Sequence, residues 1–368
     1  MAAKLNLDEQ LLIDMYKAGK TYKQIAEELG VSKRSIERYG SRLAKRGLID
    51  TINKPGFAVT GESVLIDNNG NVKLKWVKTS QDREKLELIM REAMNAFTEE
   101  LPRVEPVPTR GKRFKEKLAL YPVFDLHIGA LAHHAECGDS YDTATAEQTF
   151  HDFLNYAVEM CPATKHAVLL IGGDFLHSDG LTPVTPLSGN ILDQDSRYAK
   201  LVYVAIRNVR HAIKLLLTNH EHVELQIIAG NHDLSGSVWL RSTFAAFYEN
   251  EPRVSVDVSP AVIHHTQYGR VFLAYHHGHS IKKPETLLQA CVSDWREDFG
   301  QSVALYAHCG HWHNQKLFES ALGNVEYHGT LAAKDAYSTN CGYRSRRQAA
   351  VILYDKEQGE FGRFYHYV

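Results

Sequence analysis

The sequence predicts a chain in two parts: an α/β domain in the C-terminal two-thirds, preceded by a small helical domain. From residue 118 onward, apolar strand-like runs alternate with helical stretches, and this alternation is typical of α/β sheets. The charge changes at the same place, because residues 1–118 carry a net charge of +6 and the rest of the chain carries −8. All 20 histidines lie in the second part, so the two parts differ in chemistry as well as in fold.

The composition is that of a soluble globular protein. Hydrophobic residues make up 44% and charged residues 23% of the chain, which excludes a disordered, collagen-like or coiled-coil polypeptide. We find no apolar run near the roughly 18 residues that a membrane span needs, and no apolar signal core at the N-terminus. The five cysteines include no CxxC pair, as in proteins whose thiols stay reduced. We therefore expect a cytoplasmic protein without membrane contact.

The first part is expected to begin with three short helices, over residues 8–18, 22–29 and 32–46. Thr21 and Gln24 form a capping box before the second helix, and Gly30 ends that helix. The spacing of apolar residues across this turn resembles the helix-turn-helix of DNA-binding proteins. The third helix would then be the recognition helix. Its cations could neutralise DNA phosphates or form a solvated basic face, and they include Lys33, Arg34, Arg38 and Arg42.

Residues 57–66 and 72–77 alternate apolar and polar side chains around an Asn-Gly turn, which predicts a β-hairpin. A hairpin here suits the wing of a winged helix-turn-helix, so we assign residues 1–78 to a DNA-binding domain of that type. Residues 79–117 are expected to form a helix from Ser80 to Leu101, followed by a proline-rich, basic linker. The apolar stripe of this helix suits domain packing or the seam of a homodimer.

Five strand-like runs in the second part each end in a cluster of side chains that can bind metal ions. Sites in α/β sheets form where strands end, so we expect these clusters to meet. Carboxylate and imidazole ligands without thiolates suit manganese, iron or zinc. There are more of them than one ion needs, which indicates two divalent ions that share a bridging carboxylate. The clusters hold Asp125 and His127; Asp174 and His177; Asn231, His232 and Asp233; His276 and His277; and His311 and His313.

The order of these motifs (D-x-H, G-D, G-N-H-D, H-G and G-H-x-H) resembles that of the calcineurin-like metallophosphoesterase superfamily. The resemblance covers residues 118–313 and implies a double β-sheet sandwich flanked by helices for residues 118–368. It also implies that Asp174 bridges the two ions. Members of the superfamily differ in whether the histidine ligand of the fourth motif directly precedes the glycine or lies one residue earlier, so His276 and His277 both stay candidates. One ion would be held by Asp125, His127, Asp174 and His313, and the other by Asp174, Asn231, His311 and one of that pair.

The second motif refines the resemblance. G-D-x-x-H at residues 173–177 looks like the DNA double-strand-break repair nucleases of the superfamily, whereas the phosphoprotein phosphatases place Asp where His177 stands. The likeness implies that His177 assists catalysis and that His232 protonates or positions the leaving group, with Asp233 placed to orient His232. His177 could instead only orient a metal ligand. About 55 residues follow the last motif, which leaves little room for the capping domain and ATPase-binding segment of those nucleases.

These observations together predict a two-metal phosphodiesterase, and a DNA nuclease in particular, that uses a metal-activated water. Manganese is the first expectation for the ions, with iron or zinc as alternatives. A basic loop could hold substrate phosphates or be a surface hairpin; it contains Arg344, Arg346 and Arg347. Two other functions stay open: a phosphodiesterase or phosphatase acting on nucleotides or other small molecules, and a DNA-binding regulator with a structural metal site. The sequence separates neither DNA from RNA nor endo- from exonucleolytic cleavage.

Overall fold

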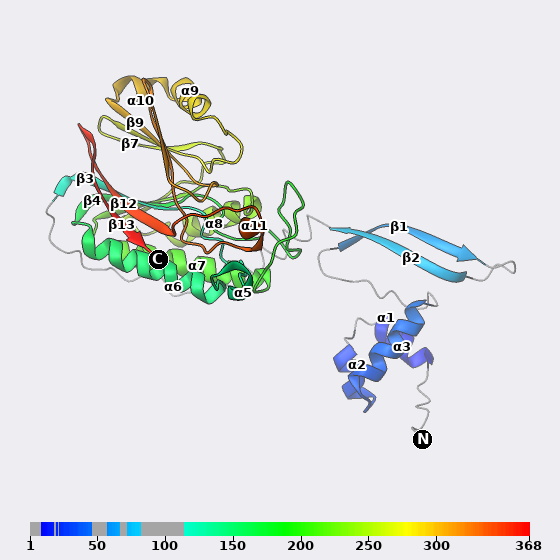
Figure 1. Cartoon of the computed structure of the whole chain (residues 1–368). Coiled ribbons are helices and arrows are strands. Elements are labelled where there is room, and N and C mark those ends of the chain that lie inside the picture. The colour runs from blue at the N-terminus through cyan, green and yellow to red at the C-terminus, as the bar shows by residue number, and fades with distance from the viewer. Residues whose placement is uncertain (1–8, 18–19, 21, 46–56, 67–71, 82–113) are drawn as a thin grey trace. The chain divides into compact units, whose positions relative to one another are not determined.

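The computed structural model describes residues 9–17, 20, 22–45, 57–66, 72–81 and 114–368. The chain divides into two compact units, Met1–Glu92 and Ala93–Val368, which are described separately (Figure 1). Within the described ranges, no helix combines the length and the apolar character that crossing a membrane requires.

The described residues of the first unit form three helices and a two-stranded antiparallel ribbon. The helices pack around a small apolar core that includes Leu12, Ile25 and Ile36. Gly30 has a φ of 63°, a left-handed conformation that glycine adopts without strain, and this lets the chain turn into the third helix. The helices lie where the sequence predicts them, whereas the DNA-binding assignment stays a prediction. The elements are α1 (Glu9–Lys17), α2 (Tyr22–Glu28), α3 (Lys33–Lys45), β1 (Phe57–Ile66) and β2 (Val72–Gln81).

The second strand of the ribbon is longer than the sequence predicts. The expected helix would begin at Ser80, but Ser80 lies in β2, opposite Ala58 of β1. Backbone pairing with the start of β1 carries the strand on to Gln81. Thr21, the remainder of the expected helix and residues 102–113 of the linker lie outside the described residues. The next strand begins at Phe114, so the last residues assigned to the linker belong to a sheet.

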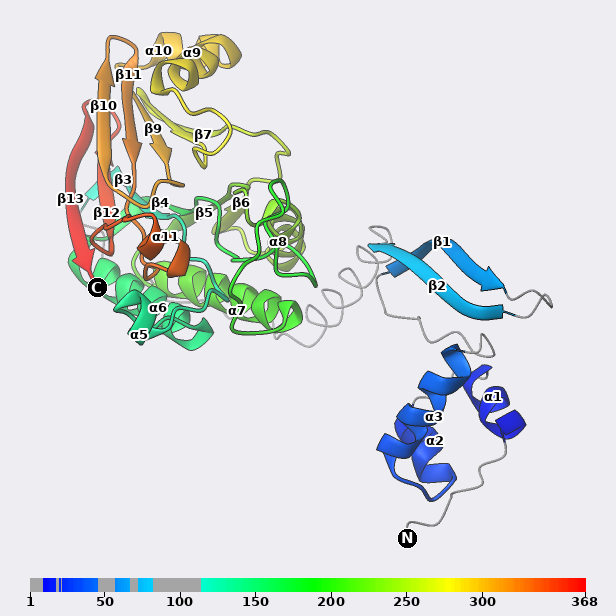
Figure 2. The ribbon, with the colours of Figure 1, turned by 45° about the vertical axis from the view of Figure 1, so that its right-hand side comes forward.

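The second unit is built on two sheets (Figure 2). The first has six strands in the order β13-β12-β3-β4-β5-β6, of which β3 to β6 run parallel. They are β3 (Phe114–Val123), β4 (Thr164–Ile171), β5 (His222–Ile227), β6 (Val254–Val256), β12 (Gln348–Asp355) and β13 (Gly359–Tyr367). The second has five strands in the order β10-β11-β9-β8-β7, of which β8, β9 and β11 run parallel. They are β7 (His264–Tyr268), β8 (Val271–Tyr275), β9 (Ala304–Cys309), β10 (Lys316–Ser320) and β11 (Gly323–Tyr327).

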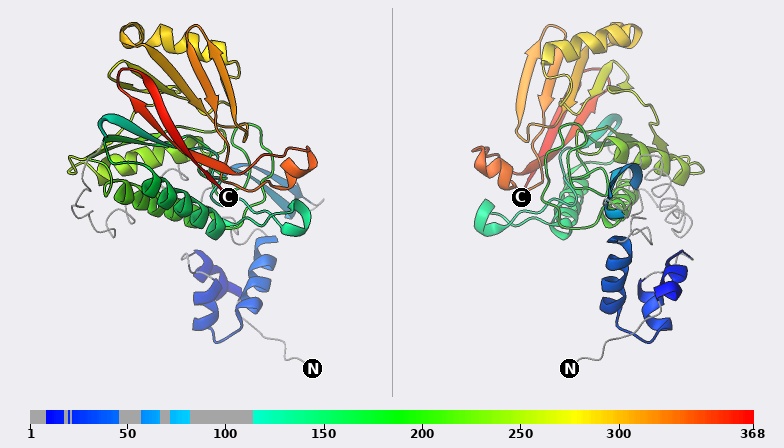
Figure 3. Two further views of the ribbon diagram at one scale, coloured as in Figure 1. Left: turned by 60° about the vertical axis from the view of Figure 1, so that its left-hand side comes forward. Right: turned by 90° about the vertical axis from the view of Figure 1, so that its right-hand side faces the viewer.

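Apolar side chains from both sheets form the core between them, among them Leu120 of β3, Leu170 of β4 and Leu273 of β8. Helices cover the outer face of each sheet (Figures 1 and 3). This arrangement confirms the predicted double-sheet sandwich flanked by helices. On the six-stranded sheet lie α6 (Thr143–Met160), α7 (Tyr198–Leu216) and α8 (Leu234–Phe247); on the five-stranded sheet lie α9 (Pro284–Asp294) and α10 (Arg296–Gln301). Two short helices, α5 (His134–Cys137) and α11 (Ala336–Asn340), lie in connections.

The helical segment over residues 284–301 is broken in two. Trp295 adopts φ −127° and ψ 57°, which separates α9 from α10. Its ring packs on that of His265, with centroids 4.6 Å apart, so a tertiary contact interrupts a segment that is locally helical. Helix α8 and the β10–β11 hairpin are not predicted from the sequence.

Candidate metal centre

The five predicted clusters lie at one edge of the sandwich. Asp125, Asp174 and Asn231 follow the carboxyl ends of β3, β4 and β5, which are parallel neighbours in the six-stranded sheet. His277 and His311 follow the ends of β8 and β9, parallel neighbours in the other sheet. Because the carboxyl ends of parallel strands share an edge, residues far apart in the sequence meet there.

The backbone at this edge is strained. Among the described residues, only five that are not glycine have a positive φ, and all five are predicted metal ligands. A left-handed conformation costs an L-residue about 1–2 kcal/mol, and such strain persists where function requires the geometry. The observation therefore singles out these positions independently of their motifs. They are Asp125 (52°), His127 (47°), Asp174 (49°), His311 (71°) and His313 (54°).

Asp125, His127 and His313 form the first group that could hold an ion. Nε2 of His127 lies 3.2 Å from Nε2 of His313, which lies 3.4 Å from Oδ1 of Asp125. Two ligands that are each about 2.1 Å from one ion lie roughly 3.0–3.4 Å apart, so these distances suit a shared ion. One ligand atom from each residue falls within 4.8 Å of the other two.

Asp174, His277 and His311 form a second group. Nδ1 of His277 donates to the carbonyl of Gly172 at 3.0 Å, and this turns Nε2 toward Oδ2 of Asp174, 3.1 Å away. Asp125 connects the two groups, because its Oδ1 is 3.9 Å from Nε2 of His277 and its Oδ2 accepts the backbone N–H of His311 at 2.8 Å. The two groups therefore adjoin.

The structure separates the two candidate histidines of the fourth cluster. His276 turns away from the carboxylates: its Nδ1 accepts the N–H of Gly278 at 2.9 Å, and its Nε2 lies 3.0 Å from the hydroxyl of Ser280. His277 faces Asp174. The geometry thus brings His277, and not His276, into the group of ligands.

The site contains polar atoms that an ion would satisfy. Oδ1 of Asp125, Oδ1 of Asn231 and Nε2 of His277 are buried and make no well-formed hydrogen bond within the described part of the chain. All three belong to predicted ligands. Buried polar atoms without a partner are costly, so their convergence at one edge fits a bound cation.

The pKa values also fit metal ligands. Burial, with a smaller effect of neighbouring histidines, lowers the pKa of His127 well below its usual range and that of His311 to about 4, which keeps both in the neutral form that binds metal. His277 differs: burial opposes its protonation, but the charge and hydrogen bond of Asp174, the charge of Asp125 and the Gly172 carbonyl together outweigh burial and raise its pKa to about 10. Asp174 also acts to raise the pKa of His127, as expected for a carboxylate close to both groups.

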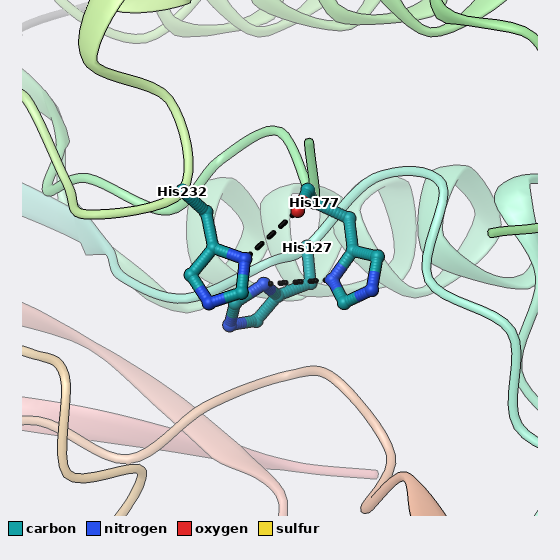
Figure 4. Close-up of side chains that lie close together, drawn as sticks. All are labelled: His127, His177 and His232. Atoms are coloured by element: carbon teal, nitrogen blue, oxygen red, sulfur yellow. Dashed lines mark hydrogen bonds between the residues drawn. The ribbon is translucent and has the colours of Figure 1, made fainter. Parts of the chain in front are cut away.

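His177 and His232 lie beside His127 (Figure 4). Nδ1 of His177 is 3.3 Å from Nδ1 of His127, and Nδ1 of His232 donates to the carbonyl oxygen of His177 at 2.8 Å. The expectation that Asp233 orients His232 is wrong. The Asp233 carboxylate instead accepts four backbone N–H groups, from Asp174, Phe175, Leu176 and Gly230.

A further buried cluster lies between the sheets, and no motif in the sequence singles it out. Nδ1 of His308 is 2.9 Å from Nε2 of His328, and Arg363 binds Glu326 through two hydrogen bonds of 2.6 and 3.1 Å. The spacing would suit an ion, but Arg363 already neutralises Glu326. The hydroxyl of Tyr354, in the other sheet, lies 2.9 Å from Nε2 of His308, so this network ties the sheets together.

The predicted phosphate-binding arginines lie between α11 and β12. Each guanidinium contacts the chain itself: Arg344 and Arg347 donate to backbone carbonyls at 2.8 and 2.9 Å, and Arg346 lies 3.5 Å from the centroid of an aromatic ring. The charge of Asp335, the N-cap of α11, acts to raise the pKa of His313. In the first unit Lys33, Arg34 and Arg38 are exposed on α3; Arg42 is on the same helix, but its side chain lies outside the description.

Comparison with protein-family models and with curated protein sequences gave no match. Among solved structures, the chain is similar to a predicted phosphoesterase from Streptococcus pneumoniae, at 12% identity over 68% of this chain and 98% of that one, with a TM-score of 0.29. It is also similar to an archaeal phosphodiesterase (13%, 68% and 99%, TM-score 0.33) and to a putative 5'-nucleotidase from Staphylococcus aureus (12%, 68% and 54%, TM-score 0.34). Likenesses this distant say nothing about the activity of the chain, so a function has to be argued from the site itself.

Proposed function

We propose that this chain is a phosphodiesterase that depends on two divalent metal ions, and that its substrate is DNA. The observation that supports the proposal best is the pair of adjoining ligand groups connected by Asp125 and Asp174. Each group supplies a carboxylate and two imidazoles, and no thiolate lies among them. Such oxygen and nitrogen donors suit manganese, with iron or zinc as the alternatives.

The proposed ligands of one ion are Asp125, His127, Asp174 and His313, and those of the other are Asp174, Asn231, His277 and His311. When bound, two such ions would generate a nucleophile from water and neutralise the charge that develops on a phosphate. The protein holds the donors in place before substrate arrives, since the strained backbone and the hydrogen bond from His277 to Gly172 fix their directions. Donors fixed in advance need no reorganisation during the reaction.

His232 is the proposed proton donor to the leaving oxygen. Its Nδ1 must carry a proton, because the partner of Nδ1 is the carbonyl oxygen of His177, which can only accept. Nε2 is then the ring atom left to face the substrate, and it can give up a proton only when His232 is the imidazolium, which carries a proton on both nitrogens. The side chain is half-buried rather than closed off. The alkoxide released from a phosphodiester is a poor leaving group, so protonation by a positioned imidazole accelerates its departure.

DNA is proposed as the substrate because cations lie in both units. The exposed side chains of Lys33, Arg34 and Arg38 on α3 can neutralise phosphates of a duplex. Arg344 and Arg346, on the segment that follows α11, can contact further phosphates. A winged helix-turn-helix in the first unit would deliver DNA to a hydrolytic second unit.

The test compares hydrolysis of labelled single- and double-stranded DNA with that of bis(p-nitrophenyl) phosphate, all in Mn²⁺. We expect the wild type to cleave DNA, Asp174→Asn to lose cleavage of both kinds of substrate, and a Lys33/Arg34/Arg38→Ala variant to lose cleavage of DNA only. Exposed His133→Ala is the matched control and should behave as wild type. If the small ester is hydrolysed while DNA stays intact, the chain is a nucleotide or small-molecule phosphodiesterase instead.

A further inference from the structure

The ring of His127 is held from both sides. Its Nε2 faces the first ligand group, 3.2 Å from Nε2 of His313, and its Nδ1 lies 3.3 Å from Nδ1 of His177 (Figure 4). Both contacts are made by the same imidazole, so the state of one nitrogen limits what the other can do. A neutral imidazole carries a single proton, on one nitrogen or the other.

The position of that proton decides whether His127 can bind an ion. A bond from Nε2 to a metal requires the proton to be on Nδ1. The contact with His177 is then N–H to N, with His127 as the donor and Nδ1 of His177 as the acceptor. In the reverse arrangement His177 donates, the proton of His127 moves to Nε2, and the lone pair needed for the ion is lost. The tautomers of the two rings are therefore coupled.

The surroundings of His177 favour the arrangement that frees Nε2 of His127. His177 is 4% exposed, and a hydrogen bond with the backbone of Asp193 acts to raise its pKa, which is the effect of an N–H that donates to a carbonyl. A proton committed to a carbonyl on one side of the ring leaves the other nitrogen as an acceptor for His127. With one nitrogen bound to each neighbour, His177 has no ring atom left for a substrate.

We propose that His177 is a positioning residue that fixes the metal-binding tautomer of His127, and that it does not exchange a proton with the substrate. The inference rests on the metal centre of the proposed function. The two neighbouring histidines then have different roles: His232 faces the substrate, and His177 acts through His127. Changes to the partner of a metal-bound imidazole commonly lower metal affinity about 10- to 100-fold.

The experiment measures Mn²⁺ binding to the full chain by calorimetric titration, with no substrate present. We expect His177→Ala and His177→Phe to weaken the binding of one ion about 10- to 100-fold, because neither side chain accepts a hydrogen bond. His177→Asn should recover most of the lost affinity, because its side-chain oxygen can lie where Nδ1 lies and accept the N–H of His127. His177→Phe fills the volume, so its loss cannot come from a cavity.

His220→Phe is the matched control. His220 is also fully buried with both ring nitrogens bonded, to Tyr121 and Thr164, but it lies at the opposite end of β4. The His220→Phe substitution should lower the thermal stability of the chain and leave its Mn²⁺ affinity unchanged. Wild-type affinity in His177→Ala and His177→Phe would overturn the inference. So would failure of His177→Asn to bind better than His177→Ala, or DNA cleavage lost in His177→Asn although both ions bind. If the wild type binds no Mn²⁺, the proposed function itself fails.

Discussion

The carboxylate of Asp233 accepts the backbone N–H of Asp174 at 3.1 Å. This bond helps to position Asp174, a proposed metal ligand. The same carboxylate accepts the N–H groups of Phe175 and Leu176 at 2.8 and 3.2 Å and that of Gly230 at 2.9 Å. Four hydrogen bonds to one buried carboxylate hold the loop after β4 against the loop after β5. Asp233 thus supports the metal centre without facing it.

Replacing Asp233 should disturb the ions and the fold together. In Asp233→Asn the side-chain NH₂ cannot accept, and because each carboxylate oxygen accepts two of the four N–H groups, two of them lose their partner. We expect the free energy of unfolding to fall by about 1–3 kcal/mol and Mn²⁺ affinity to fall at least about tenfold. Asp142→Asn is the control, because Asp142 caps α6 through Thr145 and Asn caps equally well. Wild-type Mn²⁺ affinity in Asp233→Asn would show that the loop is placed by other contacts.

Because the backbone at His313 is left-handed, we expect glycine to be more stable than alanine at this position, the reverse of their usual order. In an apo sample, His313→Gly should be more stable than His313→Ala by about 1 kcal/mol, because a φ of 54° strains alanine but not glycine. At exposed Asn155, in the interior of α6, alanine should be the more stable of the pair. Urea unfolding in EDTA measures all four variants. Equal stabilities of the two His313 variants would mean that the ligand backbone is not strained.

Gly230 leaves room for a metal ligand. A Cβ at this position would lie 2.1 Å from Oδ1 and 2.2 Å from the backbone nitrogen of Asp174, so Gly230→Ala must displace that residue. We expect Mn²⁺ affinity and DNA cleavage to fall at least about tenfold. Gly300→Ala, on α10 with open space around its Cβ, should leave both unchanged. A Gly230→Ala protein that binds two ions as tightly as wild type would contradict this account of the loop.

The buried network between the sheets predicts a loss of stability in acid. Burial opposes ionisation of Glu326, but the charge of His328 and the hydrogen bonds from Arg363 outweigh it and lower the pKa of Glu326 to about 2 from the ordinary 4.5. Its contribution to the free energy of unfolding is therefore complete above about pH 4.5 and is lost as the pH falls toward 2. Glu326→Gln should be less stable than wild type at pH 6, and the difference should narrow by pH 3. A constant difference, measured by urea unfolding at each pH, would exclude this role.

Much of the site could be predicted from the sequence because its side chains lie just after the ends of β-strands. The ligands lie directly after apolar runs, and parallel strands bring such positions to one edge whatever the separation along the chain. The double sheet, by contrast, was expected from the resemblance of the motifs. Helix α8 is not predicted from the sequence because its first turn contains serine and glycine, which are weak helix formers.

Other features depend on contacts that no local pattern carries. His276 and His277 are adjacent, and only the turn after β8 decides which imidazole faces Asp174. Asp233 follows a histidine in its motif, but its partners are backbone groups, which are the same at every residue. His308 lies only two residues before the G-H-x-H motif and yet is inside β9, where it belongs to the network between the sheets.

The most direct test is the cleavage of labelled double-stranded DNA during a titration with Mn²⁺, with the bound ions counted in the same samples. We predict that cleavage appears as two equivalents of Mn²⁺ bind to each wild-type chain, and that Asp174→Asn loses tight binding of both ions together with cleavage. Cleavage that persists in Asp174→Asn, or wild-type chains that bind two ions without cutting DNA, would contradict the two-metal nuclease.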